Sequence, residues 1–186
     1  MFLTETRLQW MRFRKLGKNV KISDKASIYN PENISIGNNV RIDDFAIISA
    51  GEDGIVLGNN VHIACYCSLI GNAKISVGNY CGISSRCSVY SSTDDYSGEW
   101  LSNPTVPDEF KNVFSAPVTL QYHVLIGAGC VILPGVTFGD GATIASMSLV
   151  NKDIPEYTLY GGVPAKFIRN QSTGWITKSL GYDQCS

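Results

Sequence analysis

The chain has few of the residues on which several common functions depend. Only two of its 186 residues are histidine, and a catalytic zinc site needs about three converging protein ligands. Its six cysteines form no second Cys or His pair with the spacing of a zinc finger;. We therefore expect no metal.

Net charge and long apolar runs are also scarce. The formal net charge is −1, whereas binding to nucleic acid needs an excess of clustered Lys and Arg, so we expect no nucleic-acid partner. No apolar run approaches the length of a membrane span and no signal peptide is recognisable, which predicts a soluble, cytoplasmic protein;. One basic cluster covers residues 12–18. It fits a solvated helix face, and also a helix lying on a membrane beside Phe2, Trp10 and Phe13.

The most prominent feature of the chain is an apolar, mostly aliphatic residue that recurs every six positions along most of its length. A half-buried strand repeats every two residues and a helix every 3.6, so this period indicates a larger repeating unit. The fourth residue after most of these anchors is also small or aliphatic. The anchors are Ile22, Ile28, Ile36, Ile42, Ile48, Leu57, Ile63, Leu69, Val77, Ile83, Val89, Leu120, Ile126, Ile132, Phe138, Ile144 and Val150.

The irregular steps between anchors predict the size of one coil. Every step longer than six is the second step of a triplet, so three hexads form one coil and all extra residues leave at one corner. We predict an all-β protein, a three-sided parallel β-helix over residues 20–154 with a long loop at 90–117. Residues 1–19 are predicted to form a helical cap, with a helix over 4–16 ended by Gly17, and residues 155–186 an extension packing on the last coils.

Two residue types follow the hexads. Glycine often comes directly after an anchor, as at Gly37, Gly58 and Gly78, which suits a corner with positive φ;. Cysteine occupies the small inward position four residues after an anchor, which predicts core packing in a reducing compartment. The cysteines in that position are Cys67, Cys81, Cys87 and Cys130.

Several segments resemble a known family. GAGCVILPGVTFGDGATIASMSLVNKDIP (127–155) and YGGVPAKFIR (160–169) resemble the left-handed β-helix acyltransferases that use acetyl-CoA. Within that family, HIACYCSLIG (62–71) and SSRCSVYSSTDDYSGEW (84–100) look most like the enzymes that acetylate dTDP-4-amino-4,6-dideoxy-D-glucose for bacterial surface polysaccharides. The resemblance implies left-handed coils, a homotrimer with active sites between subunits, and transfer of acetyl from acetyl-CoA to the amine of a nucleotide-linked sugar.

The same resemblance implies a coenzyme site. Small corner residues approach the pantetheine arm in these enzymes, and a basic pair meets the nucleotide phosphates. The residues at those positions here are Ala128, Ser146, Asn151, Lys152, Lys166 and Arg169. Cations at the mouth of a narrow groove suit phosphate, although Lys152, Lys166 and Arg169 could equally be ordinary surface charges.

The catalytic base is where the chain departs from better-known relatives. Galactoside and maltose O-acetyltransferases carry a histidine on the loop after the strand corresponding to Val89, and Asp94 occupies that place here. An amine acceptor needs a weaker base than a hydroxyl, so aspartate favours an amino sugar. Transfer to a sugar hydroxyl is the alternative, as is a plain Asp-Asp turn. A purely structural role for the β-helix also stays open.

His62 is the leading candidate for the general base, with His123 in reserve;. The alternative for His62 is a solvent-facing edge residue. His62 and Asp94 are both predicted to be catalytic, and neighbouring subunits of a trimer could bring them together. Tyr66 and Arg86 are predicted to meet the nucleotide, and Asp95 and Tyr96 on the loop are predicted to meet the sugar.

Overall fold

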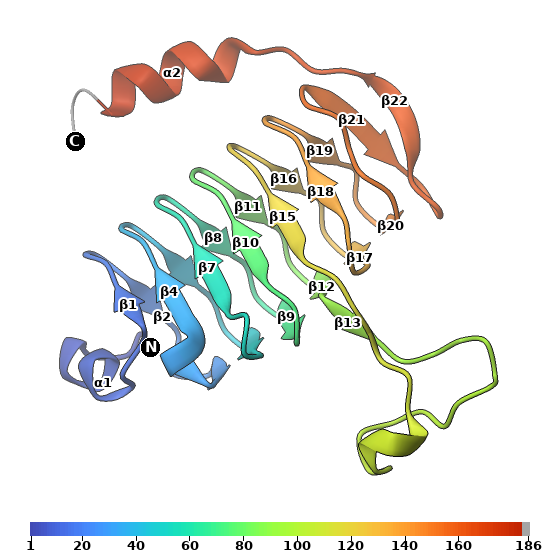
Figure 1. The fold of residues 1–186 in the computed structure, drawn as a ribbon. Helices are drawn as coiled ribbons and strands as arrows, with labels where there is room; N and C mark the ends of the chain where they lie inside the picture. The colour runs from blue at the N-terminus through green and yellow to red at the C-terminus, as the bar shows by residue number, and fades with distance from the viewer. Residues whose placement is uncertain (184–186) are drawn as a thin grey trace.

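Three parallel sheets form the faces of a prism, as the hexad spacing predicts. The computed structural model describes residues 1–183 and winds them into a three-sided β-helix (Figure 1). The chain runs repeatedly from face I to face II to face III and back. Face I contains β1 (Lys15–Leu16), β4 (Ile34–Ile36), β7 (Ile55–Leu57), β10 (Ile75–Val77), β15 (Val118–Leu120) and β18 (Thr137–Phe138).

Faces II and III complete each coil. Face II contains β2 (Lys21–Ile22), β5 (Arg41–Ile42), β8 (His62–Ile63), β11 (Gly82–Ile83), β16 (Leu125–Ile126), β19 (Thr143–Ile144), β21 (Thr158–Gly161) and β22 (Lys166–Asn170). Face III contains β3 (Ser27–Tyr29), β6 (Ile47–Ala50), β9 (Ser68–Gly71), β12 (Ser88–Tyr90), β17 (Val131–Ile132) and β20 (Leu149–Val150).

The anchors of successive coils pair in register and fill the core. Ile42 pairs with Ile63, which pairs with Ile83 on the next coil. These side chains are 0–1% exposed. Three hexads therefore make one coil, because each face receives every third anchor and stacks it on the one below.

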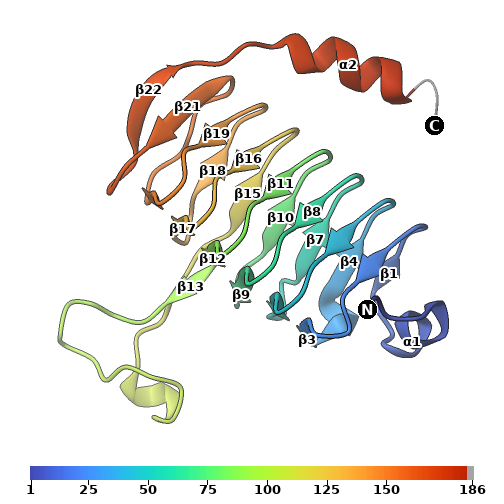
Figure 2. The same cartoon turned by 180° about the vertical axis from the view of Figure 1, so that it is seen from behind.

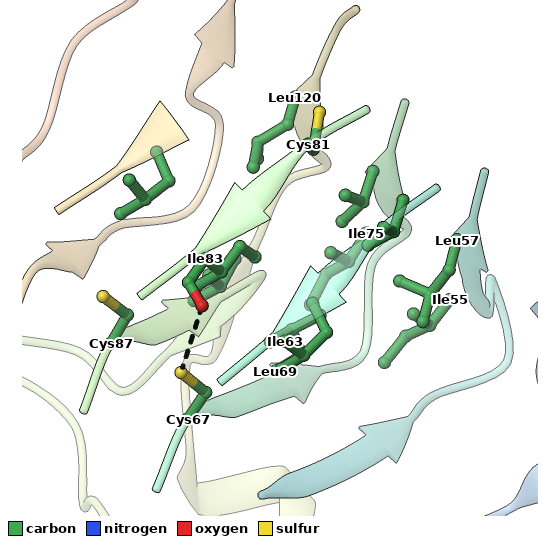
Figure 3. Close-up of a cluster of buried hydrophobic side chains, with 14 of the residues drawn as sticks. Ile55, Leu57, Ile63, Cys67, Leu69, Ile75, Cys81, Ile83, Cys87 and Leu120 are labelled. Atoms are coloured by element: carbon green, nitrogen blue, oxygen red, sulfur yellow. Dashed lines mark hydrogen bonds between the residues drawn. The ribbon is translucent and has the colours of Figure 1, made fainter. Parts of the chain in front are cut away.

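The four cysteines in the inward position are buried, as predicted. Figure 3 shows Cys67, Cys81 and Cys87 among isoleucine and leucine side chains. Each thiol has a backbone carbonyl partner on the next coil; the Cys81 Sγ lies 3.0 Å from the Gln121 oxygen. Burial raises the pKa of Cys81 to about 12. The Cys81 thiol is therefore an inert packing group, whereas a hydrogen bond with Cys87 lowers the pKa of the Cys67 thiol.

The prediction that glycines after anchors adopt positive φ is wrong. At Gly37, Gly58 and Gly78 an added Cβ would lie 2.5–2.6 Å from atoms of the next coil, and none of the three has positive φ. Close approach between coils is what requires glycine there. Positive φ occurs at other corner residues, which are Asn39, Asn60, Tyr80 and His123 at the I–II corner and Phe45, Tyr66, Arg86 and Met147 at the II–III corner.

The N-terminal helix is shorter than predicted. α1 (Glu5–Trp10) begins after Thr4, whose hydroxyl accepts a hydrogen bond from the Arg7 N–H at 3.3 Å. The chain turns at Arg12, with φ of 57°, and residues 15–16 join face I as β1. Pairing with the next coil thus replaces the predicted last helical turns. Gly17 does not end a helix; its added Cβ would lie 2.3 Å from the Gly37 carbonyl oxygen.

The C-terminal residues add two more strands to face II before the chain leaves the coils. β21 pairs parallel with β19, and β22 returns antiparallel to β21. α2 (Gly174–Asp183) then runs back along the prism (Figures 1 and 2). Trp175 stacks on the His123 ring at 4.2 Å, with the planes inclined by 8°, so the helix lies against the I–II corner.

Every connection between anchors that is longer than six residues lies at the III–I corner. These connections include η1 (Pro31–Asn33) and the excursion between β12 and β15, which contains the antiparallel pair β13 (Ser92–Thr93) and β14 (Phe114–Ser115) and the short helix η2 (Asp108–Phe110). This excursion projects away from the prism (Figures 1 and 2). Over residues 1–183, no helix has the length and apolar character to cross a membrane.

Candidate active site

His62 lies on the outer surface of face II, in β8 (His62–Ile63). The strand pairing places Arg41 beside it on the preceding coil and Gly82 beside it on the following coil. Half of the His62 side chain is exposed. Because Gly82 has no side chain, the space next to the imidazole ring stays open.

Asp43 and Arg41 hold the His62 ring in place. The His62 Nε2 lies 2.8 Å from Asp43 Oδ2, and Arg41 Nε lies 2.6 Å from Asp43 Oδ1. Partial burial by itself raises the pKa of Asp43, but the hydrogen bonds from His62 and Arg41 outweigh it and lower the pKa below its usual value. Asp43 is therefore a carboxylate at neutral pH. When Nε2 carries the ring proton and donates a hydrogen bond to Asp43, Nδ1 is free to accept a proton from another group.

A hollow of about 280 Å³ opens beside His62. Ala64, Gly82 and Leu125 give it small or apolar walls, while Ser84 and Ser85 supply two hydroxyl groups. A histidine and two hydroxyls around an open space can orient a small polar acceptor and remove its proton.

Small residues continue from this hollow along the II–III corner. The Ser85 carbonyl accepts from the Gly129 N–H at 3.0 Å, and the Ala128 carbonyl accepts from the Met147 N–H at 2.8 Å. Ser85, Ala128 and Ser146 thus occupy equivalent positions on successive coils. Ala128 and Ser146 are exposed, and such short side chains leave the backbone accessible to a thin ligand.

Tyr66 and Arg86 lie on the same corner. The Tyr66 ring stacks on Phe45 at 4.9 Å, and the Arg86 guanidinium lies 5.8 Å from the Tyr66 ring centre. Lys25 covers the other side of Phe45 at 5.5 Å. This stack presents aromatic surface and two cations along the II–III corner, groups that can contact a nucleotide base and its phosphates;.

The loop residues lie apart from His62 within one chain. Asp94 is exposed just after β13, and Tyr96 is 91% exposed. Asp95 accepts hydrogen bonds from the Ser97 N–H and hydroxyl, which lower its pKa. The loop leaves the III–I corner, whereas His62 lies on face II, the face opposite that corner. A single chain therefore does not bring Asp94 to His62.

The predicted coenzyme residues also fall in three places. Ala128 and Ser146 lie on the II–III corner, while Asn151 and Lys152 follow β20 and lie on the III–I corner. Lys166 and Arg169 are exposed on β22, at the C-terminal end of face II.

Sequence reasoning missed four residues near His62, namely Arg41, Asp43, Ser84 and Ser85. The length of one coil could have identified these four residues. Residues about 20 positions apart on face II are neighbours on successive strands, so counting one coil back from His62 and Ala64 reaches Arg41 and Asp43. Counting one coil forward from Ala64 reaches Ser84. Within residues 1–183, no three His, Cys, Asp or Glu side chains are grouped so as to hold a metal ion.

Known proteins match the chain over nearly its full length. A dTDP-4-amino-4,6-dideoxy-D-glucose acyltransferase of Escherichia coli is 50% identical over 171 residues, covering 92% of this chain and 89% of that protein. AntD, an N-acyltransferase from Bacillus cereus, is 40% identical. Its S84A mutant bound to dTDP-4-amino-4,6-dideoxyglucose and coenzyme A gives a TM-score of 0.96 over 100% of this chain and 98% of that chain.

A further crystal structure of AntD, with dTDP and 3-hydroxybutyryl-CoA, gives a TM-score of 0.95 and covers 99% of this chain and 97% of that chain. No protein-family model matches the chain.

The chain folds into a three-sided β-helix of hexads, and acyl-transferring enzymes match it throughout. It is therefore a hexapeptide-repeat acyltransferase, and its fold is the predicted left-handed β-helix. Within that class, the chain belongs to the family of the dTDP-4-amino-4,6-dideoxy-D-glucose acyltransferases. The resemblance predicted from the hexads and from residues 127–155 and 160–169 is confirmed.

Proposed function

We propose that this protein transfers an acyl group from acyl-CoA to the 4-amino group of dTDP-4-amino-4,6-dideoxy-D-glucose in the cytoplasm. The observation that carries the proposal is the line of small residues from the hollow at His62 and Ser84 to Ala128 and Ser146. It suits an extended thioester whose reactive end reaches an amine held in the hollow. Acetyl is the expected group, and a short hydroxyacyl group is the variant suggested by the ligand of AntD.

In the proposed reaction, an amide bond forms as the thioester bond breaks and coenzyme thiol leaves. His62 Nδ1 accepts the proton of the attacking amine and then gives it to the departing thiolate, while Asp43 holds the ring and stabilises the intervening imidazolium. The Ser84 hydroxyl orients the acceptor, and backbone N–H groups along the corner stabilise the oxyanion. Tyr66 and Arg86 contact the nucleotide. Lys152, Lys166 and Arg169 pair with phosphates of the coenzyme.

We further propose that the protein acts as a homotrimer, with each site between two subunits. The separation of Asp94 from His62 within one chain supports this arrangement, as does the division of the coenzyme residues between two corners. A neighbour's loop would bring Asp94, with Asp95 and Tyr96, over the sugar. AntD has been crystallised as D94A and S84A mutants, and this chain has aspartate and serine at the same two numbers.

The acceptor is tested by following the free thiol released from acetyl-CoA. We expect rapid release with dTDP-4-amino-4,6-dideoxyglucose and little with simple galactosides, because the hollow and loop are proposed to take a nucleotide-linked amine. Mass spectrometry should find the acetyl group as an amide. Turnover of galactosides alone would instead favour the O-acetyltransferase alternative.

We expect Asp94→Asn to lower kcat/KM by about 10²-fold, because the amide cannot accept a proton from an ammonium group or pair with it. Glu99→Gln on the same exposed loop is the matched control and should keep the parent rate. An Asp94→Asn enzyme as fast as the Glu99→Gln enzyme would remove Asp94 from the mechanism.

Mixing subunits tests the shared site. Trimers reassembled from His62→Asn and Asp94→Asn chains should regain activity, because some interfaces then combine an intact His62 with an intact Asp94. Activity that stays at the level of the separate variants would place both residues of one site in the same chain.

A further inference from the structure

Basic residues are concentrated at one end of the prism. Residues 1–25 contain seven Lys and Arg against two acidic residues, a net charge of +5, while the remaining residues carry −6. Residues 1–25 form α1, β1, β2 and their connections, which close the N-terminal end (Figure 1). The overall charge of −1 therefore conceals a strong separation of charge along the prism axis.

Most of these basic side chains form no hydrogen bond or ion pair within residues 1–183. Arg14 donates to the Glu32 carbonyl oxygen and to Asn33 Oδ1, and Lys25 pairs with Asp44 at 3.0 Å. The other five are exposed, and within residues 1–183 their side chains make no hydrogen bond or ion pair. They are Arg7, Arg12, Lys15, Lys18 and Lys21. Unpaired cations gathered on one surface attract an anionic partner.

An aromatic side chain projects among them. Leu8 of α1 is 6% exposed and packs on the core, whereas Trp10 is 75% exposed. Two residues along a helix correspond to a rotation of about 200°, so Trp10 lies on the face opposite Leu8. Packing on the prism therefore does not explain the position of this large apolar group.

Beside α1 the end of the prism is hollowed. The hollow has a volume of about 590 Å³, and the apolar residues Leu8, Phe13 and Leu16 form part of its lining. Arg12 and Lys18 also line it, together with one carboxylate, Glu5, among the residues described. Apolar surface bordered by cations matches the boundary of a lipid bilayer, where phosphates lie directly above hydrocarbon.

From this arrangement we propose that the N-terminal end of the prism docks on the surface of an anionic lipid bilayer. Arg7, Arg12 and Lys18 pair with headgroup phosphates, and Trp10 enters the interface, where tryptophan is enriched in membrane proteins. Binding is peripheral and reversible, because α1 has six residues and cannot span a bilayer;. A duplex nucleic acid would also offer phosphates, but it has no hydrocarbon to cover the exposed Trp10 side chain.

Co-sedimentation of the full chain with vesicles tests this proposal. We expect binding to vesicles containing phosphatidylglycerol, weak binding to pure phosphatidylcholine, and release at high salt. Arg12→Glu with Lys18→Glu should lower the partition coefficient at least about tenfold, since each cation near an anionic surface contributes to binding. Trp10→Ser should remove the blue shift of tryptophan fluorescence that accompanies binding.

The matched control is Lys74→Glu with Lys178→Glu, which changes the net charge equally at exposed positions outside residues 1–25. It should bind like the parent chain. Equal losses in the two double variants would overturn the proposal, as would equal binding to both kinds of vesicle or tighter binding to a short DNA duplex. Acyl transfer without vesicles should be unchanged in both variants, so a failure of membrane binding is distinguishable from a failure of the proposed function.

Discussion

Replacement of His62 by asparagine should lower kcat/KM by about 10²–10⁴-fold, the range typical of a lost general base. Asparagine can keep a hydrogen bond to Asp43, which lies 2.8 Å from the imidazole, but it cannot accept a proton. Initial rates of thiol release from acetyl-CoA measure this loss.

The chain provides its own control for this experiment. His123 is the other histidine, and its ring is stacked on Trp175 at the I–II corner, on a different part of the prism. His123→Asn should therefore keep the kcat/KM of the parent enzyme. If His62→Asn turned over at the parent rate with an unchanged melting temperature, His62 would not be the base.

Gly37→Ala should lower the thermal stability of the protein much more than Gly82→Ala does. An added Cβ at Gly37 would lie 2.6 Å from both the carbonyl carbon and the oxygen of Gly58, so one of the two coils has to move. Overpacking of this kind costs about 3 kcal/mol of unfolding free energy. In a chain of this length such a loss corresponds to a fall in melting temperature of about 6–12 °C.

Gly82→Ala is the matched comparison for stability. Its added Cβ would meet only a methyl group of Leu125, at 3.4 Å, and Gly82 does not have positive φ. Thermal denaturation of the two variants should therefore separate them clearly, with Gly82→Ala near the parent protein. Similar melting temperatures would mean that the coils can part at low cost.

The faces of the prism could be predicted from the sequence because each anchor has the same environment in every coil. Ile42, Ile63 and Ile83 are all buried at equivalent positions, so one physical requirement recurs at fixed spacing and leaves a visible pattern. The helix over residues 4–16 could not be predicted correctly in the same way. An apolar residue at position 16 is compatible with a helix and with a strand. The pairing of β1 with β4, which the local sequence does not reveal, makes this segment a strand.

The candidate site was less predictable because its contacts cross between coils. His62 is identifiable as a rare residue type, but its partner Asp43 lies 19 residues away, and nothing in the local sequence links the two. The role of glycines such as Gly37 was misread for the same reason. Whether a glycine serves a positive φ or a close contact depends on the coil stacked above it.

The confinement of every long step to a single corner has a consequence for how such enzymes can diversify. Insertions there, from the short helix η1 to the excursion that carries Asp94, leave the spacing at the other two corners untouched. One vertex can therefore be lengthened and changed in sequence, while the vertex lined by Ala128 and Ser146 keeps a uniform pitch, which suits the extended acyl donor that we propose there.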